Sequence, residues 1–223
     1  MIKRFKNRST PKDERVKKLI EGIIQFHETR RQGYEETFSK LALGQKPDAL
    51  FIACSDSRMA VNVFASTDPG DLFVVRNVGN LVPPHGQPGG TGTAAALDFA
   101  VDILKVKDII VCGHSDCGAM HAHAKGHETL PEGSLKAWLN MGATDTAKGL
   151  EVNEASRRNV LAQLEHLKSY PSVEKAMRER DLGLHGLWFD IRQLEVLYHD
   201  GATRAWVVLD EKDGSRILQQ LKR

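Results

Sequence analysis

Two thiols and one imidazole stand where two short apolar segments of this 223-residue chain end. Cys54 closes the segment Ala49–Cys54, and His114 and Cys117 follow the segment Asp108–Cys112. Zinc readily binds two cysteines and one histidine, and three protein ligands leave the fourth position open, as in catalytic zinc sites. We therefore predict one zinc ion per chain, bound by these three side chains.

An acidic and a basic residue lie close behind the first thiol. Asp56 and Arg58 are two residues apart on the turn after Cys54, where a guanidinium can hold a carboxylate with two hydrogen bonds. Alone, each would be an ordinary surface residue, and Cys54 alone would be an ordinary buried thiol. Their combination at the end of a predicted strand indicates a reactive site.

The elements that must position these residues form a predicted parallel α/β sheet. Three continuous apolar runs, 49–54, 71–75 and 108–112, are typical of strands covered on both faces. An Ala-rich stretch with helical periodicity, 91–104, lies between the second and the third run. We expect an α/β fold whose central, mostly parallel sheet has the order 2-1-3-4 with an added edge strand, flanked by helices. The first and third strands are then neighbours, and their carboxyl ends meet where such sheets bind ligands.

Helical segments precede and follow this core. Residues 12–30 and 34–43 predict an N-terminal helical arm over 1–44, because their apolar positions recur every three or four residues. The second half predicts two helices followed by two or three short strands, over 153–169, 173–180, 184–191, 193–198 and 204–209. With no internal repeat and no linker rich in proline or serine, we expect a single domain over 1–223, with its zinc-binding core at 45–223.

The composition argues against several classes of function. The formal net charge of +2 is too even to favour nucleic acid as a partner. An apolar run of about seven residues near the start, or of about twenty anywhere, is missing, so neither a secretory signal nor a membrane span is expected. Early acidic residues argue against a transit peptide, and three cysteines are too few for a disulfide framework. We therefore expect a cytoplasmic protein.

Four blocks of the sequence resemble those of the β-class carbonic anhydrases, above all the plant chloroplast and bacterial cyanate-operon enzymes. Cys-Ser-Asp-Ser-Arg at 54–58 and His-Ser-Asp-Cys-Gly-Ala at 114–119 are specific as a pair. Pro-Gly-Asp-Leu-Phe-Val-Val-Arg-Asn at 69–77 and Leu-His-Gly at 184–186 extend the similarity, which runs from about residue 45 to residue 190. The resemblance implies a zinc enzyme that hydrates CO2 reversibly to bicarbonate and a proton through a zinc-bound hydroxide.

The resemblance also implies roles beside the metal. Arg58 would hold Asp56, which leaves the fourth zinc position to water and lets Asp56 accept a hydrogen bond from it. An unpaired Asp56 would instead bind the zinc and close the site. Two thiolates neutralise the zinc charge, so this water should be more basic than in a three-histidine site, and activity should rise toward alkaline pH.

Substrate binding is implied for four further residues. Gln45 would donate to the substrate from across a dimer interface, Phe73 and Phe99 would form an apolar wall, and the Gly118 N–H would be a second donor. Phe99 stands where the plant enzymes have tyrosine, and plain core packing explains both rings equally well. The resemblance implies a homodimer or a larger homo-oligomer, with a tetramer expected.

One regulatory feature of the family is expected to be missing. Some β-class enzymes are switched off when bicarbonate binds a tryptophan, an arginine and a tyrosine near the zinc. The matching positions here hold Phe51, Arg76 and Phe189, so this chain has neither the indole nor the phenol at these positions. We predict no such lock.

Two other functions remain open on the sequence. One is hydrolysis of a CO2-like molecule such as carbonyl sulfide or carbon disulfide, which would use the same ligands. The other is a zinc-stabilised binding or regulatory protein without turnover. The intact residues beside the predicted metal argue against this last function.

The remaining thiol and a group of histidines are also candidates for chemistry. Cys112 is expected to be a buried strand thiol. His121, His123 and His127 would suit a second metal site if they lay on a strand, where residues two apart share a face. A helix or an exposed loop is the structure that we expect for them.

Overall fold

The computed structural model describes residues 12–126, 129–142 and 149–221. The chain forms two units, Met1–Gln45 and Lys46–Arg223. The first unit is helical, and the second contains the sheet and the predicted metal ligands. Among the described residues, no helix has the length and apolarity needed to cross a bilayer.

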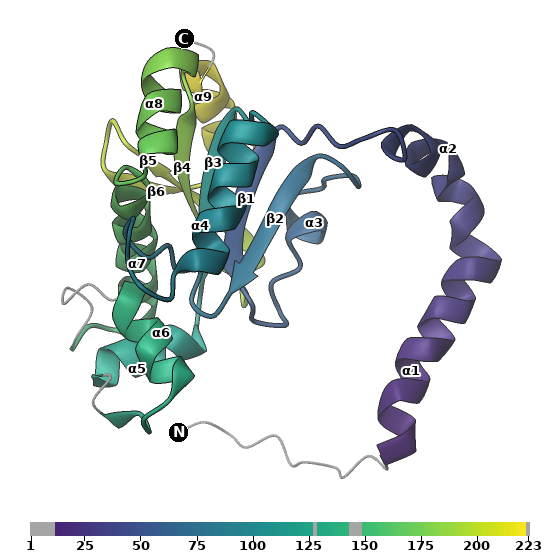
Figure 1. Cartoon of the computed structure of the whole chain (residues 1–223), viewed down its shortest axis with the longest axis horizontal. Helices are drawn as coiled ribbons and strands as arrows, with labels where there is room; N and C mark the ends of the chain where they lie inside the picture. The colour runs from purple at the N-terminus through teal and green to yellow at the C-terminus, as the bar shows by residue number, and fades with distance from the viewer. Residues whose placement is uncertain (1–11, 127–128, 143–148, 222–223) are drawn as a thin grey trace. The chain divides into compact units, whose positions relative to one another are not determined.

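The N-terminal unit has a long apolar face in contact with solvent. Helix α1 (Lys12–Gln25) continues through a π-helical turn, η1 (Phe26–Arg30), into α2 (Arg31–Leu41) (Figure 1). The helix predicted over 12–30 is confirmed, and the second helix begins earlier than predicted. Five apolar side chains of α1 are each between 50 and 65% exposed: Val16, Leu19, Ile20, Ile23 and Ile24. Such a face is typical of a surface that another molecule covers.

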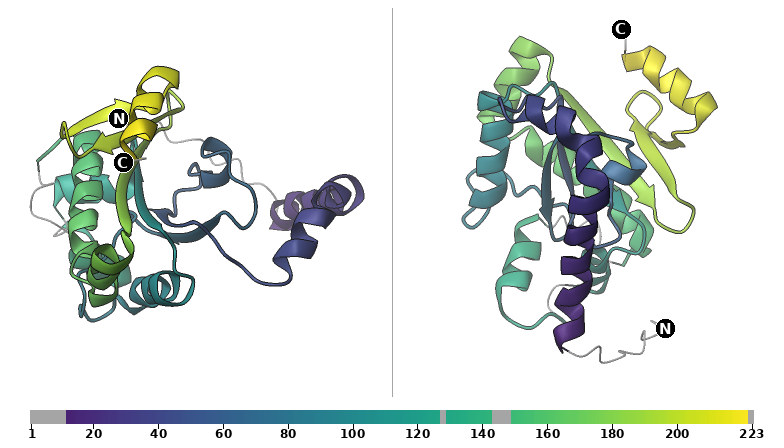
Figure 2. Two further views of the ribbon diagram at one scale, coloured as in Figure 1. Left: turned by 90° about the horizontal axis from the view of Figure 1, so that it is seen from above. Right: turned by 90° about the vertical axis from the view of Figure 1, so that its right-hand side faces the viewer.

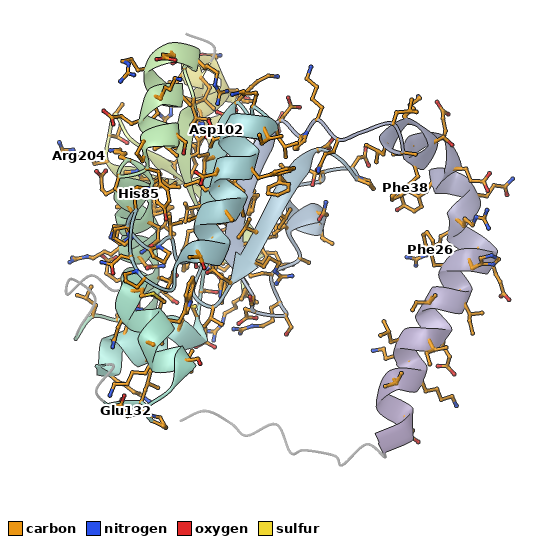
Figure 3. All side chains as sticks on the ribbon, viewed as in Figure 1. Phe26, Phe38, His85, Asp102, Glu132 and Arg204 are labelled. Atoms are coloured by element: carbon orange, nitrogen blue, oxygen red, sulfur yellow. The ribbon has the colours of Figure 1, made fainter. Side chains whose placement is uncertain are left out.

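Aromatic rings extend this face along the next two elements. Phe26 shares one shallow groove with Leu19 and Ile23, and another with Tyr34 and Phe38. The rings of Phe26 and Tyr34 have centroids 6.1 Å apart, and those of Tyr34 and Phe38 are 6.2 Å apart (Figure 3). We call this continuous surface from α1 to α2 the apolar strip.

The second unit is built on a sheet whose strand order is β2-β1-β3-β4-β5-β6. The first four strands of this order are parallel, and the last two are antiparallel additions. The predicted order 2-1-3-4 is therefore confirmed, and the added edge consists of two strands. The strands are β1 (Ala49–Cys54), β2 (Leu72–Asn77), β3 (Asp108–His114), β4 (Gly183–Asp190), β5 (Glu195–Asp200) and β6 (Ala205–Val208).

Strand β1 supplies both hydrophobic clusters of the core, which explains its unbroken apolar sequence. Leu50 and Ile52 pack in the cluster that α4, α7 and α8 cover, and Phe51 and Ala53 pack in the cluster that includes residues of α3, α5 and α6 (Figures 1 and 2). Alternate side chains of a strand point to opposite faces, so every residue of β1 is buried. These helices span Val61–Phe64 (α3), Thr91–Asp98 (α4), Gly118–Lys125 (α5), Ser134–Gly142 (α6), Val152–Leu167 (α7) and Pro171–Arg180 (α8).

Some elements differ from the predictions. The helix predicted over 91–104 is α4 followed by a π-helical turn, η2 (Phe99–Ile103). Helices α3, α6 and α9 (Glu211–Leu221) were not predicted. The histidine segment forms α5, so His121 and His123 lie on a helix, as expected. His127 is outside the described residues.

Candidate metal centre

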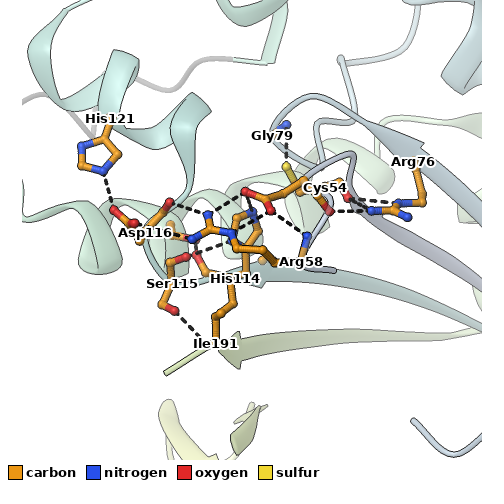
Figure 4. A network of polar contacts seen from close by, with 12 residues as sticks. Cys54, Arg58, Arg76, Gly79, His114, Ser115, Asp116, His121 and Ile191 are labelled. Atoms are coloured by element: carbon orange, nitrogen blue, oxygen red, sulfur yellow. Dashed lines mark hydrogen bonds and ion pairs between the residues drawn. The ribbon is translucent and has the colours of Figure 1, made fainter. Parts of the chain in front are cut away.

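The carboxyl ends of β1 and β3 bring the predicted metal ligands together. β1 ends at Cys54 and β3 ends at His114, and the two strands are hydrogen-bonded parallel neighbours. Since β2 lies on the other side of β1, the winding of the sheet reverses between β1 and β3. The loops that follow the two strands therefore face each other across this switch point (Figure 4).

The donor set that the sequence predicts is confirmed as a cluster. One ligand atom from each of Cys54, His114 and Cys117 lies within 4.8 Å of the other two, and all three residues are buried. Two thiols and an imidazole at this separation suit one tetrahedral zinc ion with its fourth position free. The fit is chemical as well as geometric, because burying these donors without a cation would leave them poorly satisfied.

The histidine ligand is held in the tautomer that a metal needs. His114 Nδ1 lies 2.9 Å from the carbonyl oxygen of Ser115, which can only accept, so Nδ1 carries the proton. Nε2 is then the atom with the lone pair, and it is buried without a hydrogen-bond partner among the described residues. A metal ligand whose other ring nitrogen is fixed by a carbonyl is the usual arrangement around zinc.

The two thiols differ in how readily they lose a proton. The hydrogen bond from Cys117, with further backbone N–H donors that include Gly79, lowers the pKa of Cys54 to about 4. The same hydrogen bond, burial and the charge on Cys54 raise the pKa of Cys117. Cys54 is therefore the thiolate of the metal-free pair, and a bound cation would draw the proton from Cys117 as well.

Asp56 and Arg58 form the bidentate ion pair that their spacing predicts. Arg58 Nε donates to Asp56 Oδ1 at 2.9 Å and Arg58 Nη2 donates to Oδ2 at 2.7 Å, while the Arg58 backbone N–H donates to Oδ1 at 3.0 Å. These hydrogen bonds are the main reason that the pKa of Asp56 falls to about 2. Asp56 Oδ2 lies 3.9 Å from His114 Nε2, so the carboxylate is beside the ligands but is bound to Arg58.

Two arginines fasten the loop after β1. Arg58 also donates to the carbonyl oxygen of Asp116 at 3.1 Å, which joins the loop after β1 to the loop after β3 (Figure 4). Arg76 on β2 donates to the carbonyl oxygens of Cys54, at 3.1 and 3.2 Å, and of Asp56, at 2.7 Å. The main chain that carries the first ligand is thus held from both sides.

Phe51 and Phe189 take the positions where some β-class enzymes have the tryptophan and tyrosine that bind regulatory bicarbonate. In this chain both are core residues. Phe189 stacks on Phe64 with ring centroids 4.6 Å apart, and Phe51 packs against the same ring at 6.3 Å. Both are buried. The absence of a bicarbonate lock stays a prediction.

Of the predicted substrate-binding residues, Gly118 lies at the metal centre. It directly follows Cys117 and opens α5, where the first backbone N–H groups have no partner within the helix. A side chain at Gly118 would meet nothing within 4 Å, so the space in front of this backbone is open. Its role as a donor to substrate stays a prediction.

Two of the other predicted substrate residues, Phe73 and Phe99, do not gather at the ligands of their own chain. Phe73 and Phe99 contact each other, with ring centroids 5.7 Å apart, and Phe73 packs against the cluster that α4, α7 and α8 cover. Cys54 and Cys117 belong to the other cluster. Gln45 is exposed and closes the N-terminal unit.

Cys112, His121 and His123 do not join the ligand cluster. Cys112 is fully buried on β3, and burial raises the pKa of its thiol. His121 Nε2 pairs with Asp116 Oδ1 at 2.7 Å, and His123 is buried in α5. The group of three donors that the described residues bring together is Cys54, His114 and Cys117.

Comparison with known proteins identifies this arrangement. A protein-family model described as carbonic anhydrase matches residues 49–196. A carbonic anhydrase of Pseudomonas aeruginosa is 40% identical over 208 residues, which cover 88% of this chain and 93% of that protein. The solved β-carbonic anhydrase CcaA matches with a TM-score of 0.78 at 36% identity, over 87% of this chain and 99% of the other. The chain belongs to the β-carbonic anhydrase family.

Membership of the β-carbonic anhydrases fixes the reaction. The enzyme hydrates CO2 reversibly to bicarbonate and a proton, and its zinc site is the cluster of two cysteines and one histidine. The function predicted from the sequence is confirmed. One chain from the crystal structures of two tetrameric β-carbonic anhydrases of Sordaria macrospora matches with a TM-score of 0.67 at 28% identity, over 84% of this chain and 97% of the other.

Several contributors to the site were missed from the sequence. They are the backbone N–H of Gly79, which donates to Cys54 Sγ at 3.4 Å, and polar side chains of α7 that bond the surrounding loops. A backbone donor has no residue-type signature. The α7 residues also gave no clear signal, because what distinguishes their amides and hydroxyls is burial, which only the structure shows.

Proposed function

We propose that this β-carbonic anhydrase works through an open zinc site, in which Arg58 withholds Asp56 from the metal. The observation that carries the proposal is the pairing of both carboxylate oxygens with Arg58, at 2.9 and 2.7 Å. Asp56 Oδ2 is only 3.9 Å from the histidine nitrogen that faces the metal position. A carboxylate held in this way leaves the fourth position to the reacting oxygen.

The residues around that position have distinct tasks. Bound zinc supplies the Lewis acidity that makes hydroxide available near neutral pH. With a pKa of about 2, Asp56 is ionised throughout the working range, so it would accept a hydrogen bond from the reacting hydroxyl and would not remove its proton. Accepting that bond orients the oxygen lone pair toward CO2. The Gly118 N–H would donate to a substrate oxygen.

We propose that the working assembly contains at least two chains and that dimers pair into a tetramer. The apolar strip of the N-terminal unit is exposed, and Gln45 is the exposed last residue of this unit. Phe73 and Phe99 pack away from the ligands of their own chain, so they can line a metal site only in a second copy. The tetrameric description of the Sordaria relatives supports the larger assembly.

A reducing compartment such as the cytoplasm is the proposed location. All three cysteines are unpaired and buried, and two of them must stay reduced to bind zinc. This use of thiols is typical of intracellular enzymes.

A stopped-flow CO2 hydration assay from pH 6 to pH 9, with zinc measured on the same full-length sample, tests the proposal. We expect one zinc per chain and a rate that rises toward alkaline pH, because two thiolates neutralise the metal charge. A rate already flat from pH 6 upward would argue against the two-thiolate ligand set. Stoichiometric zinc without CO2 turnover would refute the open site.

A further inference from the structure

Helix α7 sends four polar side chains to the loops around the metal ligands. They recur at intervals of three or four residues and so lie along one side of the helix. Each bonds the backbone of a different residue: Asn153 Oδ1 accepts from Asp116 N at 2.9 Å, Ser156 Oγ donates to His114 O at 2.8 Å, Asn159 Nδ2 donates to Gly79 O at 3.0 Å, and Gln163 Oε1 accepts from Val82 N at 2.7 Å.

The contact at Gly79 leads directly to a metal ligand. The N–H of Gly79 donates to Cys54 Sγ at 3.4 Å (Figure 4). The carbonyl oxygen of the same residue accepts from Asn159. One residue of the loop after β2 therefore connects α7 to the thiolate. Asn159 lies 80 residues after Gly79, so tertiary packing and not local sequence sets this contact.

The loop conformation at Gly79 needs such a support. Gly79 has φ +83° and the next residue, Asn80, has φ +46°, so two consecutive residues adopt the left-handed region. A side chain at Gly79 would come within 2.9 Å of the Cβ atom of Ala119, which makes glycine necessary here. Residues in rarely populated backbone regions persist when their surroundings hold them.

The orientations of the two side-chain amides that support this loop, Gln163 and Asn159, are fixed, because each hydrogen bond leaves only one choice of donor and acceptor for the next. Val82 N–H can only donate, so Gln163 must present Oε1 to it and Nε2 to Asn159 Oδ1, which lies 3.0 Å away. Asn159 must then present its amide Nδ2 to the Gly79 carbonyl. Asn159 is 5% exposed and Gln163 is fully buried, so water does not compete for these bonds.

We propose that Asn159 is a positioning residue for the zinc ligand Cys54, acting by holding Gly79 so that its N–H meets the sulfur. A hydrogen bond to a ligand sulfur fixes the direction of its lone pairs and reduces the charge that it donates to the metal. The inference rests on Cys54 as a zinc ligand and is independent of whether the fourth position is open.

Zinc affinity is the first test, measured by competition with a chromogenic chelator on the full-length protein. Asn159→Leu keeps the number and branching of the side-chain heavy atoms and lacks the donor. We expect its zinc affinity to fall by about 10- to 100-fold, the usual cost of losing an outer-shell partner. Asn159→Ser is made beside it, since this smaller polar residue also loses the contact and guards against a folding failure of the first variant.

Leu167→Ala is the matched control. Leu167 is fully buried on the same helix and packs in the hydrophobic cluster that α4, α7 and α8 cover. Its side chain makes no hydrogen bond because it is wholly apolar. Its truncation should lower the melting temperature of the zinc-free protein without changing the affinity of the folded protein for zinc. Equal losses of affinity in Leu167→Ala and the Asn159 variants would mean that α7 acts only through general stability, which overturns the proposal.

The absorption spectrum of the cobalt-substituted protein is the second test. Without the Gly79 donor the Cys54 sulfur gives more charge to the metal, so the thiolate-to-cobalt band should move to longer wavelength in both Asn159 variants and stay in place in Leu167→Ala. A wild-type spectrum and wild-type zinc affinity in the Asn159 variants would overturn the proposal. Zinc binding by the wild type without CO2 turnover would count against the open site alone.

Discussion

At the scale of single residues, the pair of Asp56 and Arg58 separates an open metal site from a closed one. Arg58→Ala frees a carboxylate whose Oδ2 lies 3.9 Å from His114 Nε2. We expect this carboxylate to occupy the fourth zinc position, so that CO2 hydration falls by about 100-fold, the upper end of outer-shell effects, while zinc content is unchanged. Stopped-flow rates and metal analysis on one sample measure both.

Arg58→Lys is the informative companion to that variant. A lysine keeps the positive charge but cannot donate two parallel hydrogen bonds to one carboxylate. We therefore expect little recovery of the hydration rate. Near wild-type activity in Arg58→Lys would show that charge alone keeps Asp56 in place.

For Cys112, unlike Arg58, we predict that substitution leaves catalysis unchanged. It is a buried thiol on β3 and does not belong to the ligand cluster. Cys112→Ala should keep its zinc and its CO2 hydration rate, and should lose on the order of 1 kcal/mol of unfolding free energy. Urea unfolding and metal analysis check this, with Cys117→Ala as the control that loses zinc. Loss of zinc in Cys112→Ala would place a third thiol at the metal.

At the scale of elements, the strands were predictable and several helices were not. β1 and β3 have uninterrupted apolar runs because helices cover them on both faces. α9 was missed because Gly214 lies inside it and a single residue of this helix, Ile217, is buried. Its apolar residues do share one side of the helix, but all of them lie in its last five residues, after the glycine.

An ion pair fastens α9 to the end of β5 and makes stability depend on pH. Arg216 donates to the buried carboxylate of Asp200 at 2.9 Å, and this bond is the main reason that the pKa of Asp200 is lowered. A carboxyl with a lowered pKa stabilises the fold above its unfolded pKa of about 3.9. That stabilisation is lost as the pH falls through the lower, folded value.

Asp200→Asn should therefore have a smaller unfolding free energy than the wild type at pH 7, and the difference should shrink as the pH falls below about 4. Urea unfolding over a series of pH values measures it. Asp213→Asn is the control, because Asp213 is 3.7 Å from Arg216 and partly exposed, so it should change stability little. A difference that stays constant with pH would contradict the assignment.

At the scale of the whole molecule, we propose that the apolar strip links catalysis to assembly. Leu19→Asp combined with Ile23→Asp places two charges on a face that we propose a second copy covers. We expect the particle mass from light scattering to fall to that of one chain. The CO2 hydration rate should fall with it, since Gln45, Phe73 and Phe99 would no longer reach a partner's site.

Glu21→Ala on the same helix is the control. Glu21 is exposed and lies 3.8 Å from Lys17 in a surface ion pair, which contributes little to stability. Its mass and activity should match those of the wild type. A fully active single chain in the Leu19 and Ile23 double variant would refute a shared active site.

The metal centre was predictable in part, and the limits are physical. Cys54, His114 and Cys117 are residue types with few uses at strand ends, so their identity indicates their chemistry. Gly79 acts through its backbone. Asn159 acts through a side-chain amide, and asparagine occurs in many helices without a functional role, so neither residue can be recognised by its type. The proposed substrate residues would act in the site of a second copy, which no pattern within one chain specifies.

The bond from Arg58 to Asp116 has a consequence for how the cell can use this protein. It joins the two ligand loops, and together with the contacts of Gly79 and Ser156 it shapes the site through bonds that do not involve zinc. We therefore expect the chain to fold and shape its metal site without zinc, unlike the small zinc domains that are unfolded without their metal. Chains made during zinc shortage would form a folded reserve, which a returning supply activates at the speed of metal binding and without new synthesis.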